Sequence, residues 1–307
     1  MEEKIIAVAP MQGYTDVPFR HYHSEIYGGD ATLYCSPFIR VEHGDIRRRD
    51  LRDITSAFND GMSLLPQVIF RDADEFNRLV DAVAAAGFDK VDLNLGCPFP
   101  PQVKKGRGAG LLQRLPELEQ VAVAVESRPE ITFSVKMRLG VTSPDEFRQV
   151  VPVLNHMPLS HVTVHPRIAA QQYGGDLYID AYSELRDALT HPVIFNGDVA
   201  TPADIDAALS RADGVMIGRG LLGRPSLIAE WREGREWSAD ERLEKILRFH
   251  GEIFAHYADT LCGDTQILMK IKPFWDYLEP EIGHKTAKLI KKATSVPKYE
   301  AAISTIS

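Results

Sequence analysis

The chain has 307 residues, of which 44% are hydrophobic and 25% are charged, and its formal net charge is −8. This composition is that of an ordinary globular protein, so it excludes a disordered or fibrous chain, and the acidic balance argues against a general polyanion-binding protein. No apolar stretch approaches about 18 residues, so we expect no membrane span.

The three cysteines, Cys35, Cys97 and Cys262, are odd in number and lack the paired spacing of a zinc site or a disulfide framework. The first residues, MEEKIIAVAPMQG, place two acids ahead of a short apolar run, unlike the positive start of a signal peptide. Together these features predict a cytoplasmic protein without a bound metal.

Short β-branched runs alternate with amphipathic stretches, the pattern of βα units around a parallel sheet. We predict eight strands, at residues 5–9, 33–35, 65–70, 90–95, 132–138, 161–165, 193–196 and 214–217. Predicted helices lie between them at 74–86, 117–126, 145–154, 182–189 and 203–209. Ser143 and Thr201 each precede a proline and an acid, as helix N-caps do. Eight units without a dinucleotide fingerprint after the first strand favour a (β/α)₈ TIM barrel over an open doubly wound sheet.

The alternation stops near residues 231–237, where Ser238 and Glu241 form a capping box that predicts a new helix. The pattern is purely helical from there, and a further helix is predicted at 282–293. We therefore predict a barrel domain at 1–235 and a small helical bundle at 236–307. Residues 266–298 carry seven lysines and three acids. Taken alone, such lysines are more often a solvated helix surface than a binding face.

Glycines follow the last two predicted strands, in NGDV at 196–199 and MIGRG at 216–220. Backbone amides at such positions can approach a phosphate closely, and Arg219 supplies charge. The alternative is that these glycines only make tight turns, but two in register weigh against it.

Lys136 and Arg138 alternate with apolar residues on the fifth strand, so both point to one side of the sheet. If that side is the interior, the cations need an anionic partner. His165 and Arg167 end the sixth strand, and Gln67 on the third strand can add an amide. A planar, electron-rich cofactor with a phosphate tail would use all of these groups, and FMN meets that description.

Cys97 stands alone between Gly96 and Pro98, directly after the fourth strand. A thiol with a pKa of about 8.5 is mostly protonated near neutrality and can act as a general acid. The glycine-rich loop at 106–110 is predicted to fold across it as a lid. The alternative is a small buried hydrophobe, a common role for free cysteine.

Six blocks in chain order resemble the signature blocks of tRNA-dihydrouridine synthases. They are APMQGYTDVPFR (9–20), VDLNLGCPFP (91–100), VKMRLG (135–140), VHPRIAAQQYGG (164–175), NGDV (196–199) and GVMIGRGLLGRP (214–225). The resemblance covers essentially the whole predicted barrel.

The resemblance implies a TIM barrel with tightly bound FMN, followed by a helical tRNA-binding domain, in a monomer that reduces the C5–C6 double bond of a tRNA uridine with NADPH. It implies that Cys97 donates the proton to uracil C5. The residues implied to contact FMN are Pro10, Met11, Gln12, Gln67, Lys136, His165, Asn196, Gly197, Asp198, Gly218 and Arg219. Candidate tRNA contacts are Asn94, Lys104, Lys105, Arg107, Arg138, Arg167, Lys270 and Lys272, and Tyr14, Phe99 and Tyr173 are candidates for stacking on the base.

Some positions depart from the family pattern. Pro101 stands where a basic residue often follows the cysteine, so Lys104, Lys105 and Arg107 are expected to replace that contact, and Ile168 replaces a hydroxyl residue. Two rival functions remain open: an FMN barrel acting on a free pyrimidine or small enone, as in dihydroorotate-dehydrogenase-type enzymes, and a flavin-free RNA-binding module. The lysine-rich tail argues against the first, and the presence of Cys97, Lys136 and His165 together argues against the second.

Overall fold

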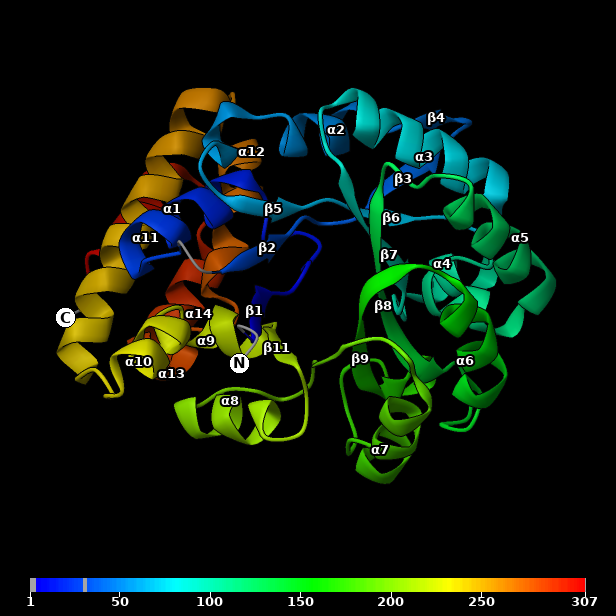
Figure 1. The fold of residues 1–307 in the computed structure, drawn as a ribbon. Helices are drawn as coiled ribbons and strands as arrows, with labels where there is room; N and C mark the ends of the chain where they lie inside the picture. Colours follow the sequence, from blue (N-terminus) through cyan, green and yellow to red (C-terminus); the bar gives the residue numbers. More distant parts are fainter. Residues whose placement is uncertain (1–3, 30–31, 307) are drawn as a thin grey trace.

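The computed structural model describes residues 4–29 and 32–306, so the first two acids of the chain, Glu2 and Glu3, lie outside the described residues. A curled, mostly parallel sheet occupies the centre of the fold (Figure 1). Its strands lie in the order β4-β3-β6-β7-β8-β9-β10-β11-β1-β2-β5. Their bounds are β1 (Ile5–Val8), β2 (Leu33–Cys35), β3 (Ile39–Glu42), β4 (Asp45–Ile46), β5 (Ser63–Leu65), β6 (Gln67–Ile69), β7 (Lys90–Leu95), β8 (Thr132–Gly140), β9 (Leu159–Ile168), β10 (Val193–Phe195) and β11 (Gly214–Ile217).

All eight predicted strands are confirmed, and each pairs with parallel neighbours. The predicted third strand is divided at Pro66, which has no N–H to donate to a ladder. The first half, β5, pairs with β2, and the second half, β6, pairs with β7. The segment 63–69 therefore connects the two ends of the curled sheet. The short antiparallel pair β3 and β4 was not predicted.

The helices are α1 (Val17–Tyr27), α2 (Arg48–Ile54), α3 (Ala73–Ala85), α4 (Pro100–Lys104), α5 (Leu115–Glu126), α6 (Phe147–His156), α7 (Ile179–Ala188), α8 (Pro202–Leu209), α9 (Arg219–Gly223), α10 (Leu227–Glu233), α11 (Ala239–Thr260), α12 (Asp264–Ile271), α13 (Glu279–Ile282), α14 (His284–Lys292) and α15 (Val296–Ile303). Short 3₁₀ turns occur at η1 (Ala57–Asn59), η2 (Gly108–Gln113), η3 (Ala169–Gln171) and η4 (Lys272–Trp275). All five helices predicted between the strands are present.

The predicted caps are confirmed at two helices and wrong at a third. The side chains of Thr201 and Ser238 accept hydrogen bonds from the backbone N–H of the residue three positions on. The predicted cap Ser143 is wrong, because α6 begins only at Phe147. The Glu146 carboxylate accepts hydrogen bonds from backbone N–H groups of residues 141–143, so the chain makes a polar turn before the helix starts.

Apolar side chains between the sheet and its covering helices form the main core. Phe76 of α3 is fully buried, with ring centres 5.4 Å from Phe70 and 5.7 Å from Phe133 of β8. Truncating such a side chain to alanine typically costs about 3–5 kcal/mol, so this packing fixes α3 on the sheet. The loops that follow the strands therefore extend from a well-packed sheet.

The helices after Trp237 lie beside α1, at the opposite side of the molecule from α5 and α6 (Figure 1). Phe249 of α11 packs against Phe19 and Tyr27 of α1, with ring centres 5.1 and 5.7 Å away. The helix predicted at 282–293 is wrong at its start, because Gly283, at φ +79°, separates α13 from α14. The division at residue 235 stays a prediction.

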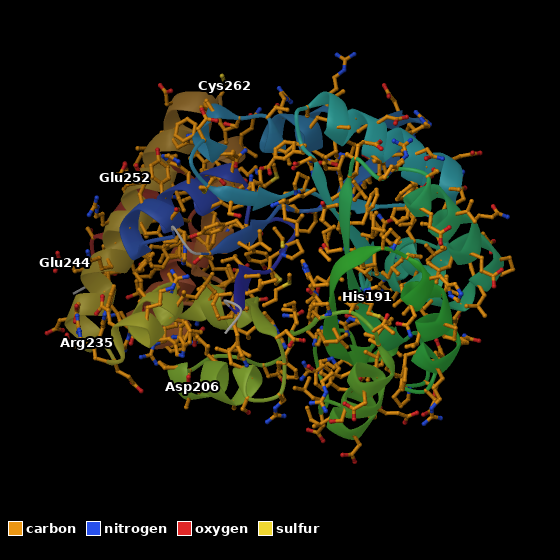
Figure 2. The ribbon with its side chains drawn as sticks, in the orientation of Figure 1. His191, Asp206, Arg235, Glu244, Glu252 and Cys262 are labelled. Carbon is orange, nitrogen blue, oxygen red and sulfur yellow. The ribbon has the colours of Figure 1, made fainter. Side chains whose placement is uncertain are left out.

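The three cysteines are all free, and Cys262 is exposed at the outer end of the helical region (Figure 2). Within residues 4–29 and 32–306, no helix is long and apolar enough to cross a membrane. The same residues contain no group of three or more His, Cys, Asp or Glu side chains that could hold a metal ion.

Candidate active site

A cavity of about 900 Å³ opens at the carboxyl ends of the parallel strands. Thirteen of the predicted site residues line it: Pro10, Met11, Gln12, Asn94, Cys97, Lys136, Arg138, His165, Asn196, Gly197, Asp198, Gly218 and Arg219. Seven others do not: Gln67, Lys104, Lys105, Arg107, Arg167, Lys270 and Lys272. Residues far apart in the sequence therefore meet at one mouth, as parallel strands require.

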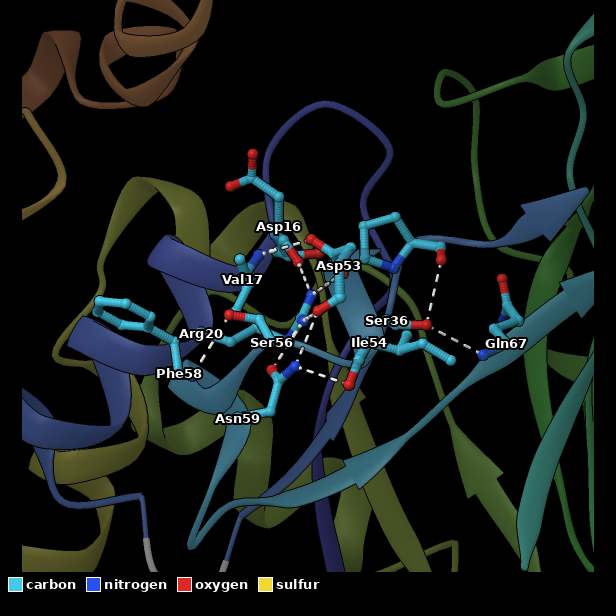
Figure 3. Close-up of polar contacts among 12 residues, drawn as sticks. Asp16, Val17, Arg20, Ser36, Asp53, Ile54, Ser56, Phe58, Asn59 and Gln67 are labelled. Atoms are coloured by element: carbon cyan, nitrogen blue, oxygen red, sulfur yellow. Dashed lines mark hydrogen bonds and ion pairs between the residues drawn. The ribbon is translucent and has the colours of Figure 1, made fainter. Parts of the chain in front are cut away.

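The loop after β1, which carries Pro10, Met11 and Gln12, is held from below by a buried arginine. Arg20 is fully buried and donates to the backbone oxygen of Thr15 at 2.8 Å and to Asn59 Oδ1 at 2.9 Å. Its Nη1 also lies 2.9 Å from Asp53 (Figure 3). Thr15 Oγ1 accepts from the Met11 N–H at 2.9 Å. Thr15 therefore links the loop to Arg20 through its backbone oxygen and to Met11 through its side chain.

Lys136 of β8 points into the cavity and donates from Nζ to Asn196 Oδ1 at 2.6 Å. The Asn196 amide donates in turn to the Met216 backbone oxygen at 2.8 Å, which fixes its orientation. Burial and the neighbouring Arg138 lower the pKa of Lys136 to about 8. Its charge is therefore costly until an anion enters the cavity.

Arg138 and His165 lie next to each other at the ends of β8 and β9. Arg138 donates to the backbone oxygens of Gly96 and Ile168, and burial lowers its pKa to about 10. Burial and the nearby cations hold the pKa of His165 well below its usual value. His165 Nε2 lies 3.2 Å from Arg167 Nη1, which can only donate, so this imidazole is neutral with its proton on Nδ1.

Asp198 lies in the loop after β10 and is a carboxylate that lines the cavity. It pairs with Arg167 at 2.5 Å and with Arg219 at 2.9 Å, and the hydrogen bond from Arg167 lowers its pKa. Arg167 is thus committed to Asp198 and to the backbone oxygens of Gly174 and Gly175. It holds the loops in place and is not among the residues that line the cavity, and its contact with tRNA stays a prediction.

Cys97 lies at the cavity wall, half-buried, and burial raises the pKa of its thiol. The Asn94 side chain accepts from the Cys97 N–H at 2.8 Å. Gln67, predicted to contact the cofactor, is fully buried and bonded to Asp92 and Asn94 instead. Gln67 is therefore not among the residues that line the cavity, and its contact with the cofactor stays a prediction.

The glycine-rich loop after Cys97 does not form an exposed lid. Its residues 108–112 are buried in η2, and Gly108, at φ +57°, lies so close that an added Cβ would be 2.7 Å from Cys97 Cβ. Arg107 is 6% exposed and donates to both Glu75 carboxylate oxygens, at 2.9 and 2.5 Å. The prediction of a lid is wrong, because this ion pair anchors the loop in the core, while the contact of Arg107 with RNA stays a prediction.

The remaining cationic candidates differ in their surroundings. Lys104 and Lys105 are exposed at the end of α4. Lys270 donates to Asp16 at 2.6 Å, and Lys272 donates to the last carbonyls of α14, including that of Lys291 at 3.1 Å. Lys270 thus connects the helical region to the start of α1 and Lys272 stabilises the helical region, while Lys104 and Lys105 have no hydrogen-bond partner within residues 4–29 and 32–306.

Two of the three candidate aromatic residues line the cavity: Phe99, 56% exposed, and Tyr173, 48% exposed. The guanidinium carbons of Arg138 and Arg219 lie 5.5 and 5.3 Å from the Tyr173 ring centre. Tyr14 does not line the cavity and donates to Asp276 at 3.0 Å.

Sequence reasoning missed several residues that line the cavity, among them Phe38, Arg40, Arg224, Tyr277 and Glu281. Phe38 lies in the loop after β2, so the rule that strand ends carry the site could have found it, whereas Arg40 lies on β3, which was not predicted. Tyr277 and Glu281 come from the helical region, and only the tertiary packing brings them to the mouth.

The fold belongs to the class of curled parallel α/β sheets found in TIM-barrel oxidoreductases. Morphinone reductase is similar with a TM-score of 0.53 at 13% identity, over 76% of this chain and 87% of that one. A variant of NCR from Zymomonas mobilis has a TM-score of 0.51 at 17% identity, with the same coverage.

Residues 7–273 match the family described as dihydrouridine synthase (Dus), and the chain belongs to that family. "Probable tRNA-dihydrouridine synthase 2" of Bacillus subtilis is 29% identical over 264 residues, 82% of this chain and 78% of that protein. A "Probable tRNA-dihydrouridine synthase" of Staphylococcus epidermidis is 30% identical over 263 residues, with coverage of 81% and 78%. A Xenopus laevis relative, "tRNA-dihydrouridine(47) synthase [NAD(P)(+)]-like", is 28% identical over 281 residues, and the chain spans only 42% of its length.

Proposed function

We propose that the protein is an FMN-dependent tRNA-dihydrouridine synthase, which reduces the C5–C6 double bond of a uridine in tRNA with NADPH as reductant. The observation that carries this proposal is the position of the Cys97 thiol on the same cavity as Lys136, His165 and Gly218. Membership of the Dus family supports the same reaction.

The residues present fit a flavin mononucleotide. The segments after β10 and β11 approach so closely that a Cβ on Gly220 would overlap the Val199 backbone oxygen. Gly197, Gly218 and Gly220 line the cavity beside Arg219. Apolar Ala9 and Met216 and the cation of Lys136 line the same cavity. Gly197, Gly218 and Arg219 would hold the phosphate, and Lys136 would lie against the polar edge of the ring.

A bound flavin would supply the hydride for C6 of the uracil. Cys97 supplies the proton for C5, and its raised pKa keeps the thiol protonated at neutral pH, as a general acid requires. Arg138, held by two backbone oxygens, and the exposed Tyr173 side chain orient the base beside the thiol. The target uridine has to leave its stack to reach this depth.

We also propose that the curled sheet acts as a complete (β/α)₈ barrel and that residues 236–307 form the tRNA-binding domain. The exposed lysines at 285, 288, 291, 292 and 298 support this, because phosphate contacts supply most of the affinity for RNA. We further propose that the protein is a monomer that acts on tRNA in the cytoplasm.

The test is the Cys97→Ala variant, with Cys262→Ala as the matched control at an exposed cysteine distant from the cavity. We expect Cys97→Ala to bind FMN and to be reduced by NADPH normally, while reoxidation by tRNA slows by about 10²- to 10⁴-fold, the usual contribution of a positioned acid. Stopped-flow absorbance of the flavin measures each half-reaction.

An unchanged rate with tRNA would remove Cys97 from the mechanism. A colourless protein that does not take up FMN would refute the flavin assignment. Reduction of free uridine as fast as tRNA would favour an enzyme acting on small pyrimidines instead.

A further inference from the structure

We propose that Asp92 is a positioning residue for Cys97, acting through the side-chain amides of Gln67 and Asn94. Hydrogen bonds join Asp92, Gln67 and Asn94 into what we term the amide chain. The kinetic part of this proposal rests on the proposed function, but the chemical reactivity of Cys97 tests it independently.

The amide chain runs through the interior from β7 to the cysteine. Asp92 is fully buried and accepts from Gln67 Nε2 at 2.7 Å and from Ser134 Oγ at 2.6 Å. Gln67 Oε1 accepts from Asn94 Nδ2 at 2.7 Å. Asn94 Oδ1 then accepts from the backbone N–H groups of Gly96, at 3.1 Å, and Cys97, at 2.8 Å.

The carboxylate at one end of the amide chain and the two backbone N–H groups at the other require the same direction of every bond between them. An ionised carboxylate only accepts, so Gln67 has to present its NH₂ group to Asp92 and its oxygen to Asn94. Asn94 then has to present its own oxygen to the Cys97 N–H. Without Asp92, only the N–H groups of Gly96 and Cys97 still hold the Asn94 oxygen in place. An Asn94 NH₂ that turned toward these two donors would push the Cys97 segment away.

Cys97 is held from the opposite side as well. The backbone oxygen of Cys97 accepts from the Ala109 N–H at 3.2 Å, and Gly108 leaves no room beside Cys97 Cβ. The Arg107–Glu75 pair anchors this second contact in the core. The thiol is therefore clamped between η2 and the amide chain, and its position depends on both.

Other charged or titratable groups also face Asp92, so its charge has to be separated from its orienting role. They are Lys136 on β8, His161 on β9 and Cys35 on β2. Burial raises the pKa of Asp92, while the bonds from Ser134 and Gln67 and the charge of Lys136 oppose that shift.

Three substitutions separate the two roles in the flavin-loaded, full-length protein. Asp92→Ala removes the acceptor and the charge. Gln67→Met breaks the amide chain but leaves Asp92 charged. Asp92→Asn removes only the charge, because its oxygen can accept from Gln67 while its NH₂ donates to the Ser134 hydroxyl. Thr163→Val is the matched control, since the Thr163 hydroxyl is buried without a hydrogen-bond partner in the described part of the chain.

We expect Asp92→Ala and Gln67→Met to slow reoxidation by tRNA about 10- to 100-fold, the cost of a displacement near 1 Å, with KM for tRNA and the rate of reduction by NADPH unchanged. We also expect Cys97 to react with iodoacetamide at least about threefold faster in both variants, because a released segment hydrates the thiol and lowers its pKa. Peptide mass spectrometry distinguishes Cys97 from Cys35 and Cys262. Asp92→Asn and Thr163→Val should behave as the native protein.

Native iodoacetamide rates in both Asp92→Ala and Gln67→Met would overturn the proposal. So would an Asp92→Asn variant as impaired as Asp92→Ala, since charge would then be the cause. If Asp92→Ala does not fold, Gln67→Met decides the question. If the native protein reduces no tRNA, the proposed function fails while the iodoacetamide rates still decide the role of Asp92.

Discussion

Replacing Arg107 by alanine tests whether this residue anchors the loop beside Cys97 or contacts RNA. Both side chains of the Arg107–Glu75 pair are 7% exposed, and the guanidinium makes two hydrogen bonds to the carboxylate. Removing one partner of such a buried pair costs about 3–5 kcal/mol, because the other charge stays buried and unpaired. Arg71 lies 3.3 Å from Glu75 and retains part of the compensation, so we expect the lower end, about 3 kcal/mol.

Urea denaturation followed by circular dichroism measures the loss of unfolding free energy in Arg107→Ala. Lys104→Ala is the matched control, because Lys104 is an exposed cation on the neighbouring helix. Removal of an exposed charge should change stability by less than about 1 kcal/mol. In titrations of tRNA affinity against salt, Arg107→Ala should keep the native slope, whereas Lys104→Ala should reduce it by about one phosphate contact. A stability loss below about 1 kcal/mol together with a reduced slope for Arg107→Ala would refute the anchoring role.

Two further predictions concern the cavity. The charged form of Lys136 attracts an anionic ligand, and the pKa of Lys136 is about 8. The affinity for FMN should therefore be full below pH 8 and begin to fall as the pH rises past 8, which fluorescence titration measures. The affinity of Lys136→Arg for FMN should not change over the same pH range. Gly108→Ala should destabilise the fold by more than the roughly 1–2 kcal/mol of a left-handed alanine and should also slow the tRNA step, because the methyl meets Cys97 Cβ at 2.7 Å. Gly234→Ala, at φ +67° with open space around it, should show only the backbone cost, and equal effects of the two substitutions on unfolding and rate would contradict the clash.

The strands, and the placement of site residues at one edge of the sheet, follow from local sequence patterns and could therefore be predicted from the sequence. Apolar runs mark the strands, and residues that follow parallel strands share one edge, which places Cys97, Lys136 and Gly218 at one cavity. The orientation of Gln67 could not be predicted in this way. It is decided by the register that pairs Gln67 with Asp92, 25 residues away.

Arg107 shows the same limit for charge. A cation in a glycine-rich loop is typical of a phosphate contact, yet its partner Glu75 lies 32 residues earlier on α3. Only the packing of α3 against the sheet brings that carboxylate within reach. Pro66 is the opposite case, since its missing N–H could have indicated the break between β5 and β6 from the sequence alone.

The aromatic cluster that α1 shares with α11 sets a rule for engineering chimaeras. Grafting a relative's helices after Trp237 onto this sheet would leave Phe19, Ile26 and Tyr27 of α1 facing foreign side chains. Any exchange of these helices should therefore carry α1 along with the transplanted segment, although α1 lies more than 200 residues earlier in the chain.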